Sequence, residues 1–483
     1  MLRFLLRRAA RPAAVLATCG AAVVAGAPAG SVALTAGSLP VPVPAISDYQ
    51  FLSAGTTPPA ESDCLAAGRR CFTAAAMENS YNLPSLYAGG NEGQGVTIAI
   101  IDSFGNPNMA ADLANFDTQM GLPHMCGEPG QACGTDVPAF QHLYWNGKTE
   151  VKSPPPGSHS PGNQDRTAWT LETSLDVEWA HAIAPLANII DITTNPAETQ
   201  GVQGFPAMMD AEQFVVDTHQ ATVISQSFGA VEEGFNGTQA MLNLRHAFVS
   251  AAASGVTVMA SSGDGGTANT VKTPVKNPST VPYPTVNWPA ADPLVTAVGG
   301  TYLCTNPVTG SGVDSTDVPA ACQANPGVRE VGWIDSGGGF SHVFAKPGYQ
   351  DTLPAGSTPI GDMRGVPDVA FQASSRTGPL VYDTAPGAGG WFIVGGTSCS
   401  APEFSGLVAI ADQMAGHGLG QINPTLYKLA VSPAHANYFY DVTTGNNQAD
   451  PSIPGYPATA GWDPVTGLGT PNAAALVPAL AAG

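Results

Sequence analysis

The amino-acid sequence predicts an α/β fold in which a parallel sheet is covered by helices on both faces. Two observations support this prediction. Short apolar runs without a polar face alternate with helix-like segments, and glycine and proline are concentrated between them. Strands buried on both faces of a parallel sheet form continuous apolar runs, and their alternation with helices is typical of α/β architecture. No internal repeat is visible, and we expect one large domain.

The predicted elements alternate along the chain. The strands are residues 96–101, 187–192, 221–225 and 256–260, and the helices are residues 170–183, 211–219 and 239–253. Further on, the apolar segment 391–394 precedes a helical segment, 404–414. Two long loops, 272–293 and 441–471, are rich in proline or glycine, and loops of this length in a compact domain usually carry function.

The charge balance disfavours two classes of partner. The chain has 37 acidic and 17 basic residues, so its formal net charge is −20 at pH 7. Nucleic acids and anionic membranes bind clustered Lys and Arg, so we expect neither as a partner. Carboxylates lose charge in acid, and the composition fits either adaptation to low pH or simply a soluble secreted surface.

Residues 1–33 have the layout of a secretory signal, because four arginines precede an Ala/Val-rich run and a series of small residues. No apolar stretch reaches the ~20 residues of a membrane span, which disfavours an anchor. The segment 16–19, ending in Cys19, loosely resembles a lipoprotein attachment box. We expect a secreted protein without membrane attachment after cleavage between residues 25 and 33. Residues 34–70 are rich in Pro and Ala, and we expect a linker or a reduced proregion.

The cysteines predict three local disulfides. In an oxidising compartment, cysteines that lie close in sequence within loop-like stretches are disulfide candidates, although six cysteines formally allow 15 pairings. The candidate pairs are Cys64 with Cys71, Cys126 with Cys133, and Cys304 with Cys322. Once Cys19 is removed with the signal, Cys399 has no partner.

Residues 395–402 have the features of a nucleophile motif. The sequence Gly-Gly-Thr-Ser-Cys-Ser-Ala-Pro ends an apolar segment and begins a helical one, so Ser398 lies at a helix N-terminus. Free backbone N–H groups and the helix dipole stabilise a developing negative charge there, and the glycines permit close approach of a substrate backbone. Cys399 is an alternative nucleophile, although its surroundings favour a packed free thiol.

The proton acceptor for this serine is predicted to be a carboxylate. None of the nine histidines lies in a motif typical of Ser-His-Asp chemistry. Glu172 and Asp176 are four residues apart and therefore share one face of the predicted helix. In solvent this pair would be an ordinary acidic helix face, but the surrounding leucines, valine and tryptophan indicate burial. Two buried carboxylates tend to share a proton, as a base and its orienting partner would in acid.

Together, these motifs resemble the sedolisin (serine-carboxyl peptidase) family. The resemblance rests on Glu-x-x-Leu-Asp-Val-Glu at 172–178, Ile-Ala-Pro at 183–185, Ser-Ser-Gly-Asp at 261–264 and Gly-Thr-Ser-x-x-x-Pro at 396–402. It implies a subtilisin-like fold for a peptidase domain spanning residues 71–483, with Ser398 as nucleophile, Glu172 as general base and Asp176 as its orienting residue. The segment 224–229 also matches, and we expect Phe228 and Gly229 to bind substrate.

The resemblance also assigns Asp264 to the oxyanion hole. An ionised aspartate would repel an oxyanion, whereas a protonated one donates a hydrogen bond to it. Read without the family, Asp264 would be a turn residue after a strand. Asp102, at the end of a predicted strand, would be at most a supporting carboxylate outside the triad.

A C-terminal loop is the expected calcium site, and the resemblance implies one structural Ca²⁺. Side-chain oxygens of Asp441 and Asp463 and backbone carbonyls of Val442, Thr459 and Gly461 would supply the ligands, and oxygen-only ligation suits Ca²⁺. Without the resemblance, two aspartates in Gly-rich turns would be turn residues.

The sequence therefore predicts a secreted, monomeric, acid-active endopeptidase that cleaves proteins or peptides. An exopeptidase of the tripeptidyl-peptidase type is the alternative on the same scaffold. A catalytically silent binding protein is disfavoured because all four matched catalytic positions are occupied. The carboxylate roles predict activity centred at about pH 3 to 5.

Overall fold

The computed structural model describes residues 43–44, 46, 48–151, 163–194, 204–271, 279–314 and 319–483, with backbone alone at 43–44 and 163–167. The expected secretory signal, residues 1–33, and Cys19 lie outside the described residues, as does part of the long loop 272–293.

A nine-stranded sheet forms the centre of the folded unit. Its strands are β3 (Thr97–Ser103), β4 (Phe140–Trp145), β5 (Glu150–Val151), β6 (Asn188–Thr194), β7 (Val223–Gln226), β9 (Thr257–Ser261), β13 (Thr296–Leu303), β14 (Glu330–Gly332) and β17 (Val369–Gln372). The order is β14-β13-β9-β7-β3-β6-β4-β5, and β17 pairs with β13. Only the pairings of β13 with β14 and of β4 with β5 are antiparallel in this sheet. The predicted α/β class is confirmed.

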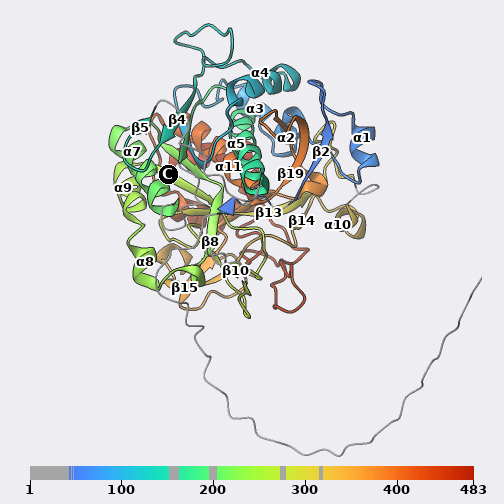
Figure 1. Cartoon of the computed structure of the whole chain (residues 1–483). Coiled ribbons are helices and arrows are strands. Elements are labelled where there is room, and N and C mark those ends of the chain that lie inside the picture. Colours follow the sequence, from blue (N-terminus) through green and yellow to red (C-terminus); the bar gives the residue numbers. More distant parts are fainter. Residues whose placement is uncertain are drawn as a thin grey trace, which may run out of the picture. The chain divides into compact units, whose positions relative to one another are not determined.

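Helices cover both faces of the sheet (Figure 1). Ile98 and Ile100 of β3 belong to the core cluster shared with α5 (Asn163–Ile183) and α11 (Thr397–Ala415). The intervening Ala99 and Ile101 belong to a second cluster with α7 (Gly204–Thr218) and α9 (His246–Ser254). Successive side chains of a strand point to opposite faces, so a strand that is apolar throughout serves two cores. On the first face, α4 (Met109–Met120) packs against α5 and α14 (Ala473–Ala482) against α11.

The four predicted strands correspond to β3, β6, β7 and β9, each displaced by one or two residues. The predicted helix 211–219 is the second half of α7, which ends before His219 because that residue is left-handed, with φ of 51°. The predicted helix 239–253 is divided into α8 (Thr238–Leu242) and α9.

Strand β13 was not predicted, because Gly299 and Gly300 interrupt its apolar run. The structure shows why glycine stands there. A Cβ at position 299 would lie 2.7 Å from Pro367, and one at position 300 would lie 2.4 Å from Ala373. The two glycines therefore allow close packing rather than a turn.

A buried ion pair holds β17 beside β13. Arg364 and Asp368 are both fully buried and lie 2.6 Å apart, and Asp368 also accepts a hydrogen bond from the backbone N–H of Ala297 at 2.9 Å. Burying a carboxylate is tolerated when it is paired and hydrogen-bonded, as here.

The segment 34–70, expected as a linker or a reduced proregion, contains regular structure in its described part. β2 (Asp48–Ser53) pairs antiparallel with β19 (Gly390–Gly395), and α1 (Glu61–Ala66) follows. β1 (Val43–Pro44) pairs antiparallel with β8 (Phe228–Val231). Asp48 pairs with Arg69 at 2.6 Å and accepts a 2.5 Å hydrogen bond from the Ser375 hydroxyl, which ties β2 to the main body.

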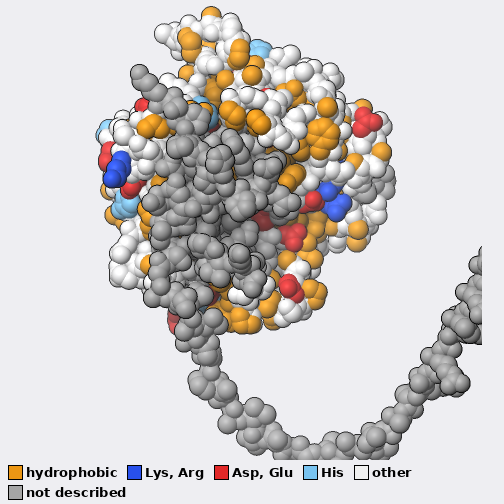
Figure 2. All heavy atoms as spheres, in the orientation of Figure 1, with side chains coloured by type: hydrophobic (Ala, Val, Ile, Leu, Met, Phe, Trp, Pro, Cys, Tyr) orange, Lys and Arg blue, Asp and Glu red, His pale blue; other side chains and the backbone are white. Residues whose placement is uncertain are grey.

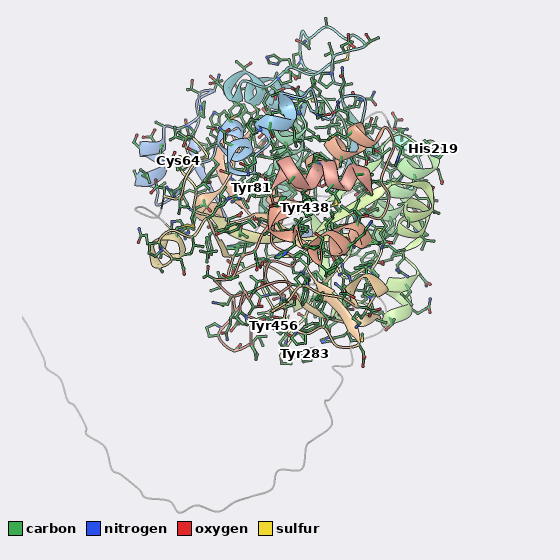
Figure 3. All side chains as sticks on the ribbon, turned by 180° about the vertical axis from the view of Figure 1, so that it is seen from behind. Cys64, Tyr81, His219, Tyr283, Tyr438 and Tyr456 are labelled. Atoms are coloured by element: carbon green, nitrogen blue, oxygen red, sulfur yellow. A yellow bond between two sulfur atoms is a disulfide. The ribbon has the colours of Figure 1, made fainter. Side chains whose placement is uncertain are left out.

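The three predicted disulfides are confirmed as Cys64–Cys71, Cys126–Cys133 and Cys304–Cys322, and Cys399 is a buried free thiol. Figure 3 shows Cys64 at one side of the molecule and His219 at the other. Within the described ranges, no helix is long and apolar enough to cross a membrane. On the face drawn in Figure 2, Lys and Arg side chains are sparse, in line with the acidic composition.

Candidate active site

Ser398 lies in the first turn of α11, directly after β19. Gly396 links the two elements with φ of 152°, and a Cβ at Gly395 would lie 2.2 Å from the backbone nitrogen of Ser375. Both glycines are therefore needed for this tight connection. Ser398 is fully buried, and its hydroxyl donates a 3.4 Å hydrogen bond to the backbone carbonyl of Ser227. The first-turn N–H groups of α11 favour negative charge beside this hydroxyl.

Glu172 and Asp176 lie on α5, which packs against α11, and both are fully buried. Ser227 connects the serine to the carboxylates, because its own hydroxyl donates to Asp176 Oδ1 at 2.9 Å. Ser227 lies between β7 and β8. One residue thus contacts both the predicted nucleophile and the predicted orienting residue, a role that sequence reasoning missed.

The environment raises the pKa of both carboxyl groups. Burial raises the pKa of Glu172 well above its usual range, the Ser398 hydroxyl opposes this rise, and the charges of Asp102 and Asp264 add to it. Burial also raises the pKa of Asp176, as do the charges of Asp102 and Glu172, while the Ser227 hydroxyl lowers it. Neighbouring buried carboxylates cannot all ionise, so the site holds protons in acid.

Two further buried aspartates belong to this acidic group. Asp102 is the penultimate residue of β3, and burial raises its pKa to about 7. Asp191, on neighbouring β6, is fully buried, and burial together with the Asp102 charge raises its pKa. His142 Nε2 lies 3.4 Å from Asp191, but burial lowers the pKa of His142 to about 4, which favours the neutral imidazole. An aspartate within the apolar run Ile-Ile-Asp-Ile was the sequence signal for Asp191.

Asp264 follows β9 and contacts the start of α11. Its Oδ1 accepts hydrogen bonds from the backbone N–H of Thr397 at 2.7 Å and from the Thr397 hydroxyl at 2.9 Å. Gly263 has φ of 110°, and a Cβ there would lie 2.0 Å from Asn287 Nδ2, so glycine is required beside Asp264. Because Thr397 directly precedes Ser398, these contacts hold Asp264 close to the predicted nucleophile. The structure therefore brings all four predicted catalytic residues together.

The predicted substrate-binding residues lie on β8. The side chain of Phe228 is fully buried, with its ring centroid 6.2 Å from that of Phe205, so it does not line a surface. Gly229 is partly exposed. β1 pairs with β8 on one side, with Val43 opposite Gly229, and β12 (Asn287–Trp288) pairs on the other. The backbone of β8, rather than the Phe228 ring, is thus the part that an extended peptide could contact.

In the predicted calcium loop, both aspartates accept hydrogen bonds from the backbone of residues 459–461. Asp441 accepts 3.1 Å hydrogen bonds from the backbone N–H of Gly461, and Asp463 accepts one of 3.1 Å from that of Thr459. Burial raises the pKa of Asp463 to about 7, and that of Asp441 also rises. Neither forms an ion pair with a Lys or Arg of the described residues. Two carboxylates without a Lys or Arg partner are oxygen donors of the kind that a hard divalent cation takes.

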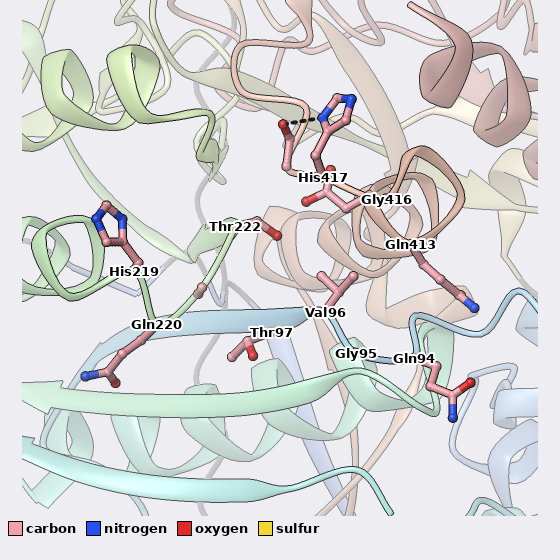
Figure 4. A pocket seen from close by; sticks show the side chains of 13 residues that line it. Gln94, Gly95, Val96, Thr97, His219, Gln220, Thr222, Gln413, Gly416 and His417 are labelled. Atoms are coloured by element: carbon pink, nitrogen blue, oxygen red, sulfur yellow. Dashed lines mark hydrogen bonds between the residues drawn. The ribbon is translucent and has the colours of Figure 1, made fainter. Parts of the chain in front are cut away.

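A pocket of about 390 Å³ lies at the opposite end of the sheet (Figure 4). It is lined by residues that precede β3 and β7 and by Gly416 and His417 after α11. Gly416 is 18 residues from Ser398, so at 1.5 Å per helical residue this pocket lies about 27 Å away. It takes no part in the catalytic geometry.

Known proteins are similar to this chain in sequence and in fold. Kumamolisin from Bacillus sp. is 30% identical over 430 residues, which are 87% of this chain and 65% of that protein. Tripeptidyl-peptidase SED1 from Arthroderma otae is 35% identical over 335 residues, 62% of this chain and 45% of its own length. The solved structure of Pseudomonas sedolisin, a serine-carboxyl proteinase, matches with a TM-score of 0.64 and 26% identity, covering 85% of this chain and 97% of that one.

No family model matches the chain. The chain spans less than two thirds of the length of the curated relatives named above.

Proposed function

Because the chain belongs to the sedolisin family of serine-carboxyl peptidases, we propose that it is an acid-active endopeptidase with Ser398 as its nucleophile. The observation that carries the proposal is the burial of Ser398 beside the carboxyl pair of Glu172 and Asp176. Within the described residues, the hydroxyl of Ser398 has no hydrogen bond with a histidine. A carboxylate is then the base that this geometry offers.

The proposed reaction follows from these contacts. The Ser398 oxygen attacks the substrate carbonyl while ionised Glu172 accepts the proton of the Ser398 hydroxyl. Asp176, which is held by Ser227, orients Glu172. Protonated Asp264 donates a hydrogen bond to the oxyanion that forms. Glu172 then returns the proton to the leaving amine, and water hydrolyses the acyl-enzyme by the same steps. In this reaction Glu172 carries the proton from Ser398 to the leaving amine, and no imidazole takes part.

Cys399 is disfavoured as the nucleophile. It is fully buried, and burial raises the pKa of its thiol well above the usual range, with the charge of Glu403 adding to the rise. Because the thiolate is the reactive form of cysteine, such a group is inert at acidic pH.

Endopeptidase activity is proposed over exopeptidase activity because kumamolisin aligns with 87% of this chain, whereas tripeptidyl-peptidase SED1 aligns with 62%. The identity to the latter, 35%, keeps a tripeptidyl-peptidase as the second candidate. Peptides with blocked N-termini distinguish the two, since removal of tripeptides requires a free amino terminus. Cleavage of blocked peptides supports the endopeptidase.

We also propose secretion, protein or peptide substrates, a monomeric state and one structural Ca²⁺. Three disulfides support an oxidising compartment. Asp441 and Asp463, with the carbonyls of Val442, Thr459 and Gly461, would hold the ion. When bound, calcium would neutralise the two carboxylates and fix this loop.

Digestion of a denatured protein at about pH 4 tests the proposal. We expect Ser398→Ala and Glu172→Gln to reduce kcat by a factor on the order of a thousand or more, as loss of a catalytic nucleophile or base does in other serine peptidases. Glu212→Gln is the matched control, because Glu212 is a fully buried glutamate on α7, on the other face of the sheet. Normal activity in either catalytic variant, with circular dichroism showing a folded protein, would reject this assignment.

A further inference from the structure

A second cluster of ionisable side chains lies at the end of α4, outside the catalytic group. Asp117, His124 and Glu128 each offer one ligand atom, and these atoms lie within 4.8 Å of one another. Among the described residues, this is the one group of three His, Cys, Asp or Glu side chains arranged closely enough to hold a metal ion. It uses none of the residues of the expected calcium loop.

The imidazole of His124 is oriented for ligation through Nδ1. Its Nε2 lies 3.3 Å from the Thr118 hydroxyl, which donates its own proton to the carbonyl of Ala114 at 2.9 Å. Thr118 therefore accepts the hydrogen of Nε2, and in the neutral ring Nδ1 carries the lone pair. Nδ1 forms a hydrogen bond with the Glu128 carboxylate, and a metal ion would replace the proton between these two atoms. A hydrogen bond that fixes the far nitrogen is a common feature of histidines that bind metals.

Histidines are the basic side chains that contact these two carboxylates among the described residues. Asp117 is fully buried, and neither of its oxygens accepts a hydrogen bond from the described residues, although Oδ2 lies 3.4 Å from His181 Nε2. His181 Nε2 donates instead to the carbonyl of Pro123 at 2.9 Å. No Lys or Arg of the described residues forms an ion pair with Asp117 or Glu128.

The cluster is held by rigid surroundings and has one open side. Glu128 Oε1 accepts the backbone N–H of Met125, and the Cys126–Cys133 disulfide closes the same loop. The side chain of Glu128 is 1% exposed, whereas that of His124 is 38% exposed. An ion could therefore enter past His124, and water could complete its coordination.

We propose that Asp117, His124 and Glu128 form a binding site for a divalent transition metal of the zinc class. One imidazole nitrogen and two carboxylate oxygens are ligands that Zn²⁺ accepts, with water in the fourth position, whereas Ca²⁺ takes oxygen ligands alone. A divalent cation would neutralise both buried carboxylates at once, which a single proton on His124 cannot do. The ion would fasten the disulfide loop to the end of α4.

Titration with Zn²⁺ at neutral pH, in saturating Ca²⁺, tests the site by calorimetry and by melting temperature. We expect one ion per chain in wild type, and binding weaker by more than roughly tenfold in His124→Ala and in Glu128→Gln. Because His124 is partly exposed, its loss should leave the fold intact, and the glutamine at 128 keeps the oxygen that accepts the Met125 N–H. Co²⁺ in place of Zn²⁺ should give visible absorption that His124→Ala abolishes.

His342→Ala is the matched control, because His342 forms an ion pair with Glu233 at the surface but belongs to no such group of three among the described residues. It should bind Zn²⁺ as wild type does. The proposal is overturned if wild type binds no Zn²⁺ at millimolar concentration, or if His124→Ala and Glu128→Gln bind it as tightly as His342→Ala. Equal affinities in these three variants would be expected if zinc bound in the calcium loop instead.

Discussion

At the scale of single residues, neutral hydrogen-bond donors hold two of the predicted catalytic carboxyl groups in place. Ser227 donates to Asp176 at 2.9 Å, and Thr397 donates to Asp264 from both its backbone and its hydroxyl. A neutral donor stabilises a carboxylate without adding the positive charge of an Arg or Lys. An Arg or Lys in either place would lower the pKa of these carboxyls and prevent their use as proton donors.

The sharpest prediction at this scale concerns Asp264→Asn. An asparagine oxygen can still accept the two hydrogen bonds from Thr397, while its amide donates at every pH. Wild type should lose kcat at the alkaline side as Asp264 ionises, and the variant should retain measurable activity without that alkaline limb. The pH profile of kcat, recorded between about pH 3 and 7, measures the difference. An unchanged alkaline limb in a folded variant contradicts the role of Asp264 as an acid donor.

At the scale of elements, the sequence predicted the strands and helices that have a local residue pattern. The apolar runs of β3, β6, β7 and β9 have no polar face, and the acidic face of α5 is visible from the four-residue spacing of its carboxylates. β13 was missed because Gly299 and Gly300 serve tertiary packing, which no local pattern shows. Ser227 was missed for the same reason: it is 51 residues from Asp176 and 171 from Ser398. The predicted catalytic residues come from motifs, whereas the residues that contact them required coordinates.

The calcium loop gives an element-scale prediction. A ligand that binds only the folded state adds RT ln(1 + [L]/Kd), so removal of Ca²⁺ should cost ~2.7 kcal/mol if it was present at 100 times its Kd. Asp463→Asn should abolish this response, because it removes one charge but keeps an oxygen for the N–H groups of Val465 and Thr466. Melting temperatures with Ca²⁺ and with a calcium-selective chelator measure the effect. Equal melting points under both conditions in wild type would exclude a structural Ca²⁺.

The pairing of β1 with β8 gives a second prediction at the scale of elements. Val43 and Pro44 lie antiparallel to Gly229 and Phe228, where an extended peptide substrate would add a strand by the same backbone hydrogen bonds. The segment before β2 should therefore compete with substrate. A chain that begins at Asp48, which keeps β2 and the Cys64–Cys71 disulfide, should show a lower KM and an unchanged kcat relative to one that begins at residue 34. Equal KM values for the two chains would show that β1 does not occupy the substrate strand.

At the scale of the whole molecule, buried carboxyl groups are spread far beyond the catalytic site. Burial raises the pKa of Glu232 to about 7 and that of Asp383 to about 6. Glu178, Glu212 and Glu403 are also fully buried and shifted in the same direction. The formal charge of −20 at pH 7 adds self-repulsion that weakens as carboxylates are protonated. The fold as a whole is thus matched to acid.

This distribution fixes the sign of the pH dependence of stability. In the unfolded chain these groups titrate near ~3.9 for Asp and ~4.3 for Glu, whereas the folded chain keeps their protons up to pH 6 or 7. Between about pH 4 and 7 the folded state therefore binds more protons than the unfolded state, and the free energy of unfolding must fall as pH rises. Groups with a lowered pKa, such as Asp48 beside Arg69, act the other way and lose their contribution only below about pH 4. Stability should be greatest near pH 4.

Urea unfolding of the inactive Ser398→Ala protein at about pH 4, 5, 6 and 7 measures this slope without self-digestion. Asp383→Asn isolates one contribution, because asparagine resembles the protonated acid and keeps the Oδ1 that accepts the N–H of Ala385 at 2.7 Å. With a folded pKa of about 6, this variant should recover up to about 3 kcal/mol of the stability lost between pH 4 and 7, at 1.36 kcal/mol per unit. Its stability at pH 4 should match that of the parent, where Asp383 is already protonated in the folded state. A midpoint that rises from pH 4 to pH 7, or a slope that Asp383→Asn leaves unchanged, would show that these buried carboxyl groups ionise without cost.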